Sequence, residues 1–343
     1  MQYSHLGDSN LSVSKICLGT MTFGEQNTQQ EAHEQLDFAV GAGVNFLDTA
    51  EMYPVPPRQQ TQGLTESYIG TWLKKYKQRD QLVIASKVAG PGMMDYLRNG
   101  AQLVREQMQQ ALHESLQRLQ TDYIDLYQIH WPARKTNFFG RLGYQFDDTD
   151  STPIEETLSV LNDFVDAGKV RYIGISNETP WGLMKYLTCA QQNNWPRVIS
   201  VQNPYSLLNR TYEVGLAEFS QRENISLLAY SPLGFGVLTG KYLEQSNIAD
   251  ARLTLFENYT RYSNLQSQAA TKKYVALAKC HDLSPAQMAL AYVNSRPFVG
   301  GNIIGATNID QLKENIESIN ITLSEDVLQE IENIHQAIPN PSP

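Results

Sequence analysis

Asn45-Phe-Leu-Asp-Thr-Ala50 is a short apolar run with an acidic residue near its end, and its form returns along the chain. Val83-Ile-Ala-Ser-Lys-Val88 and Tyr123-Ile-Asp-Leu-Tyr-Gln-Ile-His130 have the same form. Each run is typical of a buried β-strand that carries an ionisable side chain near its carboxyl end. In a β/α barrel these ends meet at one mouth, where catalytic groups lie.

Strands of this kind alternate with amphipathic helical stretches eight times. The predicted strands are Lys15–Gly19, Asn45–Ala50, Leu82–Val88, Tyr123–His130, Val170–Ser176, Ile199–Asn203, Ser226–Ser231 and Asn302–Gly305. The predicted helices cover residues 29–42, 65–77, 102–119, 154–167, 180–193, 212–223, 284–295 and 308–318, with start signals such as Thr65-Glu66 and Ser284-Pro285. Alternation predicts a parallel sheet, and eight repeats predict a closed α/β (TIM) barrel, (β/α)8.

Four segments go beyond a minimal barrel. Residues 3–13 predict a hairpin that plugs the barrel floor, and residues 324–336 predict an extra terminal helix. Long loops are expected at 131–153, after the fourth strand, and at 237–262, after the seventh. Only the proline-rich tail Pro339–Pro343 resembles a linker, so residues 1–343 are predicted to form a single domain.

The amino-acid composition limits the kinds of molecule that this protein can bind and the cell compartment in which we expect it. The 343 residues are 41% hydrophobic and 18% charged, with a net charge of −9 and no basic run, which argues against nucleic-acid and anionic-membrane partners. Cys17, Cys189 and Cys280 have neither a metal-ligand spacing nor a disulfide pattern. The amino terminus lacks a charged leader with an apolar core, and no apolar run approaches ~18 residues. We therefore expect a cytoplasmic protein without a metal; the oligomeric state stays open.

Asp48, Tyr53, Lys87 and His130 are expected to form one chemical unit. Lys87 lies inside an apolar strand, where an unpaired ammonium costs several kcal/mol, so it needs a carboxylate such as Asp48. A cation beside Tyr53 favours phenolate, and lowering the phenol pKa from ~10 to ~7 needs ~4 kcal/mol. We expect Lys87 and a hydrogen bond from His130 to supply it, so that the phenol protonates a developing alkoxide.

Two stretches match a known family in detail. Asn45-Phe-Leu-Asp-Thr-Ala-Glu-Met-Tyr53 places Asp and Tyr five residues apart, and Arg118-Leu-Gln-Thr-Asp-Tyr-Ile-Asp-Leu126 is followed by Gln128-Ile-His130. In these features the chain resembles the aldo-keto reductase superfamily. The resemblance runs from Leu18–Gly24 to Gln311–Asn315 and implies hydride transfer to a carbonyl compound, with Tyr53 as the acid.

The branch of that superfamily can also be narrowed. Met52-Tyr-Pro-Val-Pro-Pro-Arg58 and the 131–153 loop are most similar to the Tas-type bacterial branch, which is related to the potassium-channel β-subunit-like group. The substrate carbonyl is then expected beside Tyr53, His130 and Trp131. The loop aromatics Phe138, Phe139, Tyr144 and Phe146 are expected to form a wall for an apolar substrate.

Hydride transfer needs a nicotinamide, because no side chain supplies hydride. The chain has no Gly-x-Gly-x-x-Gly, so a Rossmann binding mode is unsupported. The resemblance implies instead an extended cofactor across the barrel mouth. The positions that it implies are Thr20, Met21, Asp48, Ser176, Asn177, Gln202, Tyr230, Ser231, Pro232, Leu233, Gly234, Gly236, Lys241, Arg252, Gly305, Thr307, Gln311 and Asn315.

These positions divide by the part of the cofactor they would hold. Ser176, Asn177 and Gln202 correspond to carboxamide contacts, and Tyr230 to the ring that stacks on the nicotinamide. The stretch 230–241 corresponds to a pyrophosphate loop, over which Arg252 would close. At the adenosine end, Gly305 and Gln311 replace the Lys and Arg of vertebrate-type reductases, but the channel-subunit-like branch shares this neutral pattern and is linked with NADPH. NADPH is therefore favoured over NADH.

Other classes fit less well. A metal hydrolase needs clustered ligands, yet of the six histidines only His130 lies at a strand end. A glycosidase needs two carboxylates flanking the bond, which the strand ends lack. A regulatory protein that binds the cofactor as a sensor remains an alternative, because an intact fold does not guarantee turnover.

Overall fold

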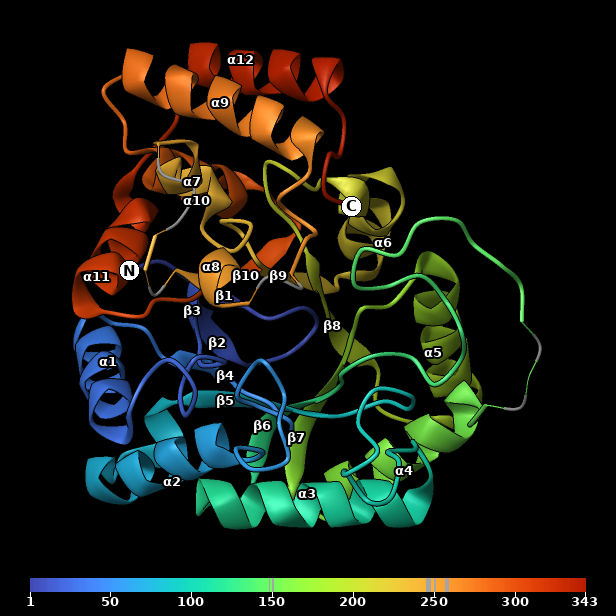
Figure 1. Cartoon of the computed structure of the whole chain (residues 1–343). Coiled ribbons are helices and arrows are strands. Elements are labelled where there is room, and N and C mark those ends of the chain that lie inside the picture. Colours follow the sequence, from blue (N-terminus) through green and yellow to red (C-terminus); the bar gives the residue numbers. More distant parts are fainter. Residues whose placement is uncertain (148, 150, 245–247, 250, 257–258) are drawn as a thin grey trace.

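The computed structural model describes residues 1–147, 149, 151–244, 248–249, 251–256 and 259–343. Eight parallel strands close into a barrel in the order β10-β3-β4-β5-β6-β7-β8-β9 (Figure 1). The strands are β3 (Ile16–Gly19), β4 (Phe46–Asp48), β5 (Val83–Val88), β6 (Ile124–Ile129), β7 (Val170–Ser176), β8 (Val198–Pro204), β9 (Ser226–Tyr230) and β10 (Val299–Ile304). The predicted (β/α)8 barrel is confirmed.

Eight helices of the predicted alternation surround the strands. They are α1 (Gln29–Gly41), α2 (Leu64–Tyr76), α3 (Arg105–Leu119), α4 (Ile154–Asp166), α5 (Pro180–Asn193), α6 (Leu216–Glu223), α10 (Pro285–Ser295) and α11 (Ile309–Glu317). Short 3-10 turns are present at Arg79–Gln81, Thr211–Val214, Val237–Thr239 and Ser318–Asn320. The predicted 212–223 helix is therefore two pieces, a 3-10 turn and α6.

The two proposed helix starts differ in outcome. Ser284 caps α10 as predicted, because its side chain accepts a hydrogen bond from Gln287 N and Pro285 occupies the first turn. Thr65 lies inside α2 instead, since the helix begins at Leu64. Its hydroxyl donates to the carbonyl of Phe23 over 2.7 Å and so ties α2 to the loop after β3.

The predicted hairpin covers the floor of the barrel. β1 (Tyr3–His5) and β2 (Ser12–Ser14) pair antiparallel, and the connection between them carries Leu6 and Leu11 into the barrel interior. Gly7, at φ +54°, lies so close to the floor that a Cβ there would meet Ile199 O at 2.2 Å. Such close approach needs glycine, and it closes this end of the barrel.

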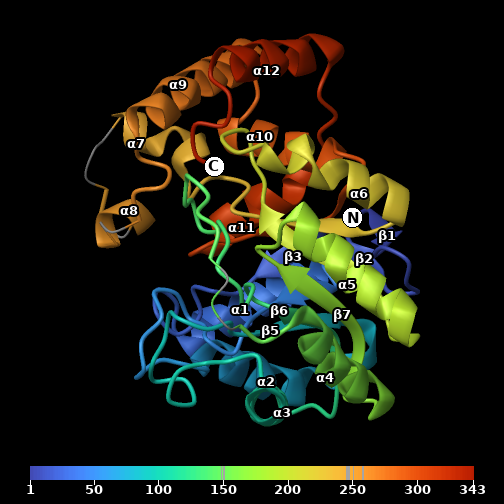
Figure 2. The ribbon, with the colours of Figure 1, turned by 90° about the vertical axis from the view of Figure 1, so that its right-hand side faces the viewer.

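Two helices lie outside the ring. α12 (Glu325–Ala337) is the predicted terminal helix, and it packs against α9 (Leu265–Cys280), which the sequence did not predict. Figure 1 and Figure 2 both show the two side by side, away from the barrel strands. The buried face of α9 consists mainly of small and polar residues, such as Ala270 and Thr271. That face has little of the apolar periodicity from which a helix is predicted.

The predicted long connections are present, although they are not uniform loops. Residues 237–262 contain the short helices α7 (Lys241–Glu244) and α8 (Arg252–Leu255). The described residues of 131–153 before α4 carry no helix or strand. Within the described ranges, no helix has the length and apolar character needed to cross a membrane.

Candidate active site

A cavity of about 1070 Å³ opens where the barrel strands end. Strand-end residues from opposite sides of the barrel line it, including Asp48, His130, Gln202 and Gly305. The space exceeds the ~300–1,000 Å³ of common small-molecule pockets, so it has room for a cofactor and a substrate together.

The predicted Lys87–Asp48 ion pair is formed and fully enclosed. Lys87 Nζ lies 2.6 Å from Asp48 Oδ2 and 2.7 Å from the Thr49 carbonyl, and neither side chain is accessible beyond a few per cent. Burial lowers the pKa of Lys87, but the charge of Asp48 and its hydrogen bond, together with Tyr53 and Cys17, outweigh burial, so the pKa stands above its ordinary value. The ammonium therefore stays charged.

Two glutamines fix the other oxygen of Asp48. Gln202 Nε2 donates to Asp48 Oδ1 over 2.8 Å, and Gln128 Nε2 approaches the same oxygen at 3.4 Å. Gln202 also donates to Gln128 Oε1 over 3.3 Å. The carboxylate is thus held on both oxygens, as a buried charge must be.

Tyr53 and His130 contact each other next to the Lys87–Asp48 ion pair. Their rings contact edge to face with centroids 5.8 Å apart, and Lys87 Nζ lies 5.0 Å from the centre of the Tyr53 ring. Both rings line the cavity. The four predicted residues are therefore neighbours.

The predicted lowering of the Tyr53 pKa is wrong for this structure. Tyr53 is only 9% exposed, and burial raises its pKa more than the Lys87 charge lowers it, while Asp48 raises it further. The prediction included the Lys87 charge but not the burial of the phenol, which is the largest cause of the shift. At neutral pH the phenol consequently keeps its proton.

His130 is held neutral. Burial, together with the charge of Lys87, places its pKa well below the ordinary value. Its Nδ1 is buried and has no hydrogen-bond partner within the described part of the chain. A neutral imidazole beside the phenol suits hydrogen bonding to a carbonyl compound rather than ion pairing.

Three polar side chains continue the site across β7, β8 and β9. Ser176 Oγ donates to the Gln202 carbonyl over 2.7 Å, and Asn177 Nδ2 donates to the His130 carbonyl over 2.9 Å. Tyr230 OH donates to Asn177 Oδ1 over 2.7 Å. Asn177 has φ +54°, a strained conformation of the kind found at ligand sites, and these bonds hold it there.

Further along the cavity lie two cations, Arg252 and Lys241, that have no carboxylate partner among the described residues. Arg252 is 9% exposed, its guanidinium lies 4.9 Å from the Phe235 ring centre, and its Nε has no partner among the described residues. Burial lowers the pKa of Arg252 and that of Lys241. A Cβ on Gly236 would lie 3.1 Å from Lys241 Nζ, so this ammonium covers a glycine turn at φ +84°. Buried positive charge of this kind suits an anion such as a phosphate.

The far end of the cavity lies at the start of α11. Asn308 caps this helix by accepting from Gln311 N over 2.9 Å, and Gln311 Oε1 accepts from Thr307 N over 3.1 Å. Asn315 Nδ2 donates to the Gly305 carbonyl over 3.1 Å. Glu314 also lines this end, so it combines neutral side chains with one carboxylate.

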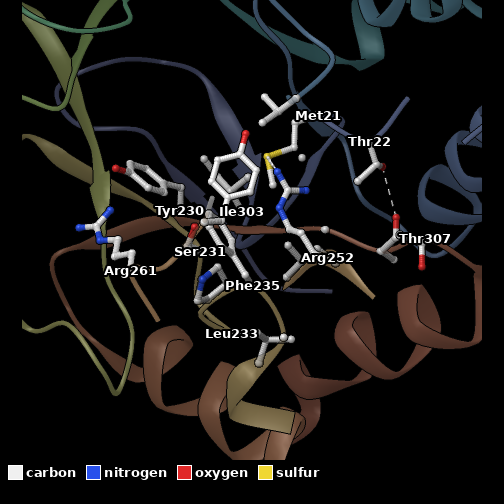
Figure 3. Close-up of a pocket in the computed structure, with 18 of the residues that line it drawn as sticks. Met21, Thr22, Tyr230, Ser231, Leu233, Phe235, Arg252, Arg261, Ile303 and Thr307 are labelled. Carbon is white, nitrogen blue, oxygen red and sulfur yellow. Dashed lines mark hydrogen bonds between the residues drawn. The ribbon is translucent and has the colours of Figure 1, made fainter. Parts of the chain in front are cut away.

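The structure brings nearly all the predicted ligand positions to this one cavity, part of which Figure 3 shows. Lys87 lies behind Asp48 rather than on the wall. Gly234 also does not line the cavity: it shapes the turn after β9 at φ +54°, where a Cβ would approach Tyr262 at 3.1 Å. The lining positions are Thr20, Met21, Asp48, Tyr53, His130, Trp131, Ser176, Asn177, Gln202, Tyr230, Ser231, Pro232, Leu233, Gly236, Lys241, Arg252, Gly305, Thr307, Gln311 and Asn315.

The aromatic wall expected from the 131–153 loop is only partly present. Trp131 and Phe139 line the cavity, with ring centroids 6.0 Å apart. Phe138 contacts Phe139 with ring centroids 5.1 Å apart and packs against the cluster that holds Trp131. Tyr144 and Phe146 are 62% and 77% exposed and lie outside the cavity lining. The composition of a loop gives no period from which to tell inward from outward side chains.

The sequence analysis missed part of the cavity wall. Arg261 and residues 341–343 line it, although the tail was interpreted as linker-like. Ser342 is fully buried, its N–H donates to the Leu208 carbonyl over 3.0 Å, and its hydroxyl lies 2.5 Å from that of Ser267. These partners are distant in sequence, so no local pattern signals the contact.

Comparison with known proteins gives consistent relatives. The family model described as "Aldo/keto reductase family" matches residues 15–336. "Protein tas" of Escherichia coli is 56% identical, with 100% of each chain covered. "Uncharacterized oxidoreductase YrpG" of Bacillus subtilis is 33% identical, covering 97% of this chain and 96% of its own. "Probable voltage-gated potassium channel subunit beta" of Oryza sativa is 31% identical, covering 99% and 98%.

Proposed function

Since the chain belongs to the aldo/keto reductase family, we propose that it reduces aldehydes or ketones to alcohols with NADPH as the hydride donor. The observation that carries this proposal is the protonated Tyr53 phenol beside the neutral His130, above the buried Lys87–Asp48 pair. A carbonyl oxygen placed between phenol and imidazole would accept a hydrogen bond from the phenol.

Each member of the group then has a role. As negative charge develops on the substrate oxygen, Tyr53 transfers its proton to that oxygen. The Lys87 ammonium, fixed by Asp48, stabilises the phenolate that remains. Neutral His130 orients the carbonyl without competing for the proton.

The cavity residues fit a dinucleotide of the NADPH type. When bound, the nicotinamide supplies the hydride. Ser176, Asn177 and Gln202 would hold its carboxamide, with Tyr230 under the ring. Arg252 and Lys241, both without carboxylate partners in the described residues, would hold the phosphates. Gly305, Thr307, Gln311 and Asn315 would surround the adenosine. These side chains are neutral, as in the channel-subunit-like branch that is linked with NADPH, and for this reason we favour NADPH over NADH.

The proposal is tested by following NADPH absorbance with a panel of aldehydes and ketones, for the wild type and for Tyr53→Phe. The substitution removes the proton donor but leaves the ring, so we expect kcat to fall by ~10²–10⁴-fold. NADPH affinity, measured by fluorescence titration, should hardly change.

Retention of more than about a tenth of kcat would contradict the role of Tyr53. Wild-type protein that binds NADPH tightly but oxidises it with no carbonyl compound would instead favour the sensor alternative.

A further inference from the structure

Arg261 is a pocket residue that none of the roles above uses. It lines the cavity beside Tyr230, and its nearness to that ring affects the pKa of both groups. Figure 3 shows Arg261 and Tyr230 on one side of the pocket and Thr307 on the opposite side, with Arg252 between. Arg261 is thus remote from the adenosine end and near the nicotinamide and substrate end.

The surroundings of Arg261 hold its side chain in place. Its Nε donates to the Pro343 backbone oxygen over 3.0 Å, and its guanidinium lies 5.5 Å from the centre of the Tyr262 ring. Its aliphatic stem runs beneath the 131–153 loop, since a Cβ on Gly140 would lie 3.4 Å from it. The guanidinium is therefore placed under the loop that covers the substrate side.

Two enclosed arginines near the site, Arg98 and Arg134, are paired with carboxylates, whereas Arg252, like Arg261, has no carboxylate partner among the described residues. Arg98 pairs with the buried Glu51 over 2.6 Å, and Arg134 pairs with the buried Glu178. Among the described residues Arg261 forms no ion pair with an Asp or Glu side chain. Arg261 also hydrogen-bonds to the Tyr230 side chain. A partly buried guanidinium that lines a cavity and has no Asp or Glu partner among the described residues is suited to bind a carboxylate of a ligand.

We propose that Arg261 recognises an anionic group on the substrate, so that the preferred substrates are carbonyl compounds that also carry a carboxylate. This inference rests on the proposed reductase function and names the substrate class of the same site. Trp131 and Phe139 line the same cavity as Tyr53 and Arg261 and supply an apolar wall for the carbon skeleton of such a substrate. The overall charge of −9 would disfavour anions, so a local cation is needed to accept them.

The test compares a carboxylate substrate with its uncharged analogue, 4-formylbenzoate with methyl 4-formylbenzoate. The readout is the ratio of kcat/KM for the acid to kcat/KM for the ester, in the wild type, Arg261→Gln and Arg141→Gln. Arg141 is a matched control, because it is an exposed arginine of the 131–153 loop, which contacts Arg261, and it does not itself line the cavity. The substitution Arg141→Gln removes one positive charge near the barrel mouth but changes no residue that lines the cavity.

We expect Arg261→Gln to lower the acid-to-ester ratio by roughly ten- to a hundredfold, the usual effect of losing a hydrogen bond to a charged group. Arg141→Gln should leave the ratio within about twofold, because exposed charges act weakly. Arg261→Lys should recover part of the ratio, since it keeps the charge but loses the fork of donors. Because Arg261 also contacts Pro343, a merely structural role would lower both rates together and leave the ratio unchanged, and that outcome overturns the proposal.

Failure of the proposed function gives a different result. If the wild type reduces neither compound, calorimetric titration of the NADP complex with 4-(hydroxymethyl)benzoate still reads out the anion site. Binding that is lost in Arg261→Gln and kept in Arg141→Gln supports the anion site even without turnover. Absence of binding by the wild type overturns it.

Discussion

Lys87 is the single side chain on which most of the site depends. It has no exposure to water, and Asp48 is its only carboxylate neighbour among the residues that the structure describes. Lys87→Met keeps the volume but leaves a buried carboxylate without its cation. We expect unfolding in urea to show a loss of about 3–5 kcal/mol, together with loss of reductase activity.

The double variant Asp48→Asn, Lys87→Met separates charge from packing. It removes both charges, so it should unfold at a higher urea concentration than Lys87→Met alone while remaining inactive. A double variant less stable than the single one would mean that packing, and not the unpaired charge, causes the loss.

His130 makes stability depend on pH in a definite direction. Its pKa is depressed in the folded protein, whereas in the unfolded chain it stands near ~6.5. The unfolded chain therefore takes up the proton first, and the stabilisation is present above pH ~6.5 and lost as pH falls below it.

His130→Gln lacks this titration. The difference in unfolding free energy between wild type and His130→Gln should thus shrink by about 1.4 kcal/mol between pH 7.5 and 5.5. A difference that stays constant over this range would show that the imidazole is not protected from protonation in the folded state.

At the scale of elements, the proposed contact of the 131–153 loop with substrate can be tested by comparing two phenylalanines of that loop. Phe139 lines the cavity, whereas Phe146 is 77% exposed and does not. We expect Phe139→Ala to raise KM for bulky aromatic aldehydes by roughly tenfold, in keeping with ~1–3 kcal/mol for apolar pocket contacts, and to affect small aldehydes much less. Phe146→Ala should behave as the wild type. Equal effects of the two substitutions would assign the loop a structural role only.

The elements that were predicted correctly are those that a local sequence pattern specifies, such as a short apolar run or an apolar period. The strand ends at Asp48, Lys87 and His130 follow from short apolar runs, and the shared mouth follows from the barrel. By contrast, the buried residues of α9, which packs against α12, are mostly Ala, Ser and Thr, and they leave no strong apolar stripe. The start of β10 was also misplaced: the strand was predicted from Asn302 but begins at Val299, because Gly300 and Gly301 interrupt the apolar run.

At the scale of the whole molecule, the contacts that escaped prediction join segments far apart in sequence. Ser342 meets Leu208 and Ser267, and Arg261 meets Gly140 and Pro343. The four residues that we propose to carry the chemistry could be named from the sequence, but the direction of the Tyr53 pKa shift could not, since burial is a property of the assembled barrel. Such contacts across the chain lead us to propose that residues 1–343 fold as one domain.

The β1–β2 hairpin determines from which end ligands can reach the barrel interior. Leu6 and Leu11 fill the floor, so the proposed cofactor and carbonyl compound would both enter from the mouth. A nicotinamide held by Tyr230 and Gln202 would then lie beneath a substrate that is covered by the 131–153 loop. We therefore expect ordered binding and release, in which the cofactor binds before the carbonyl compound and dissociates only after the alcohol has left.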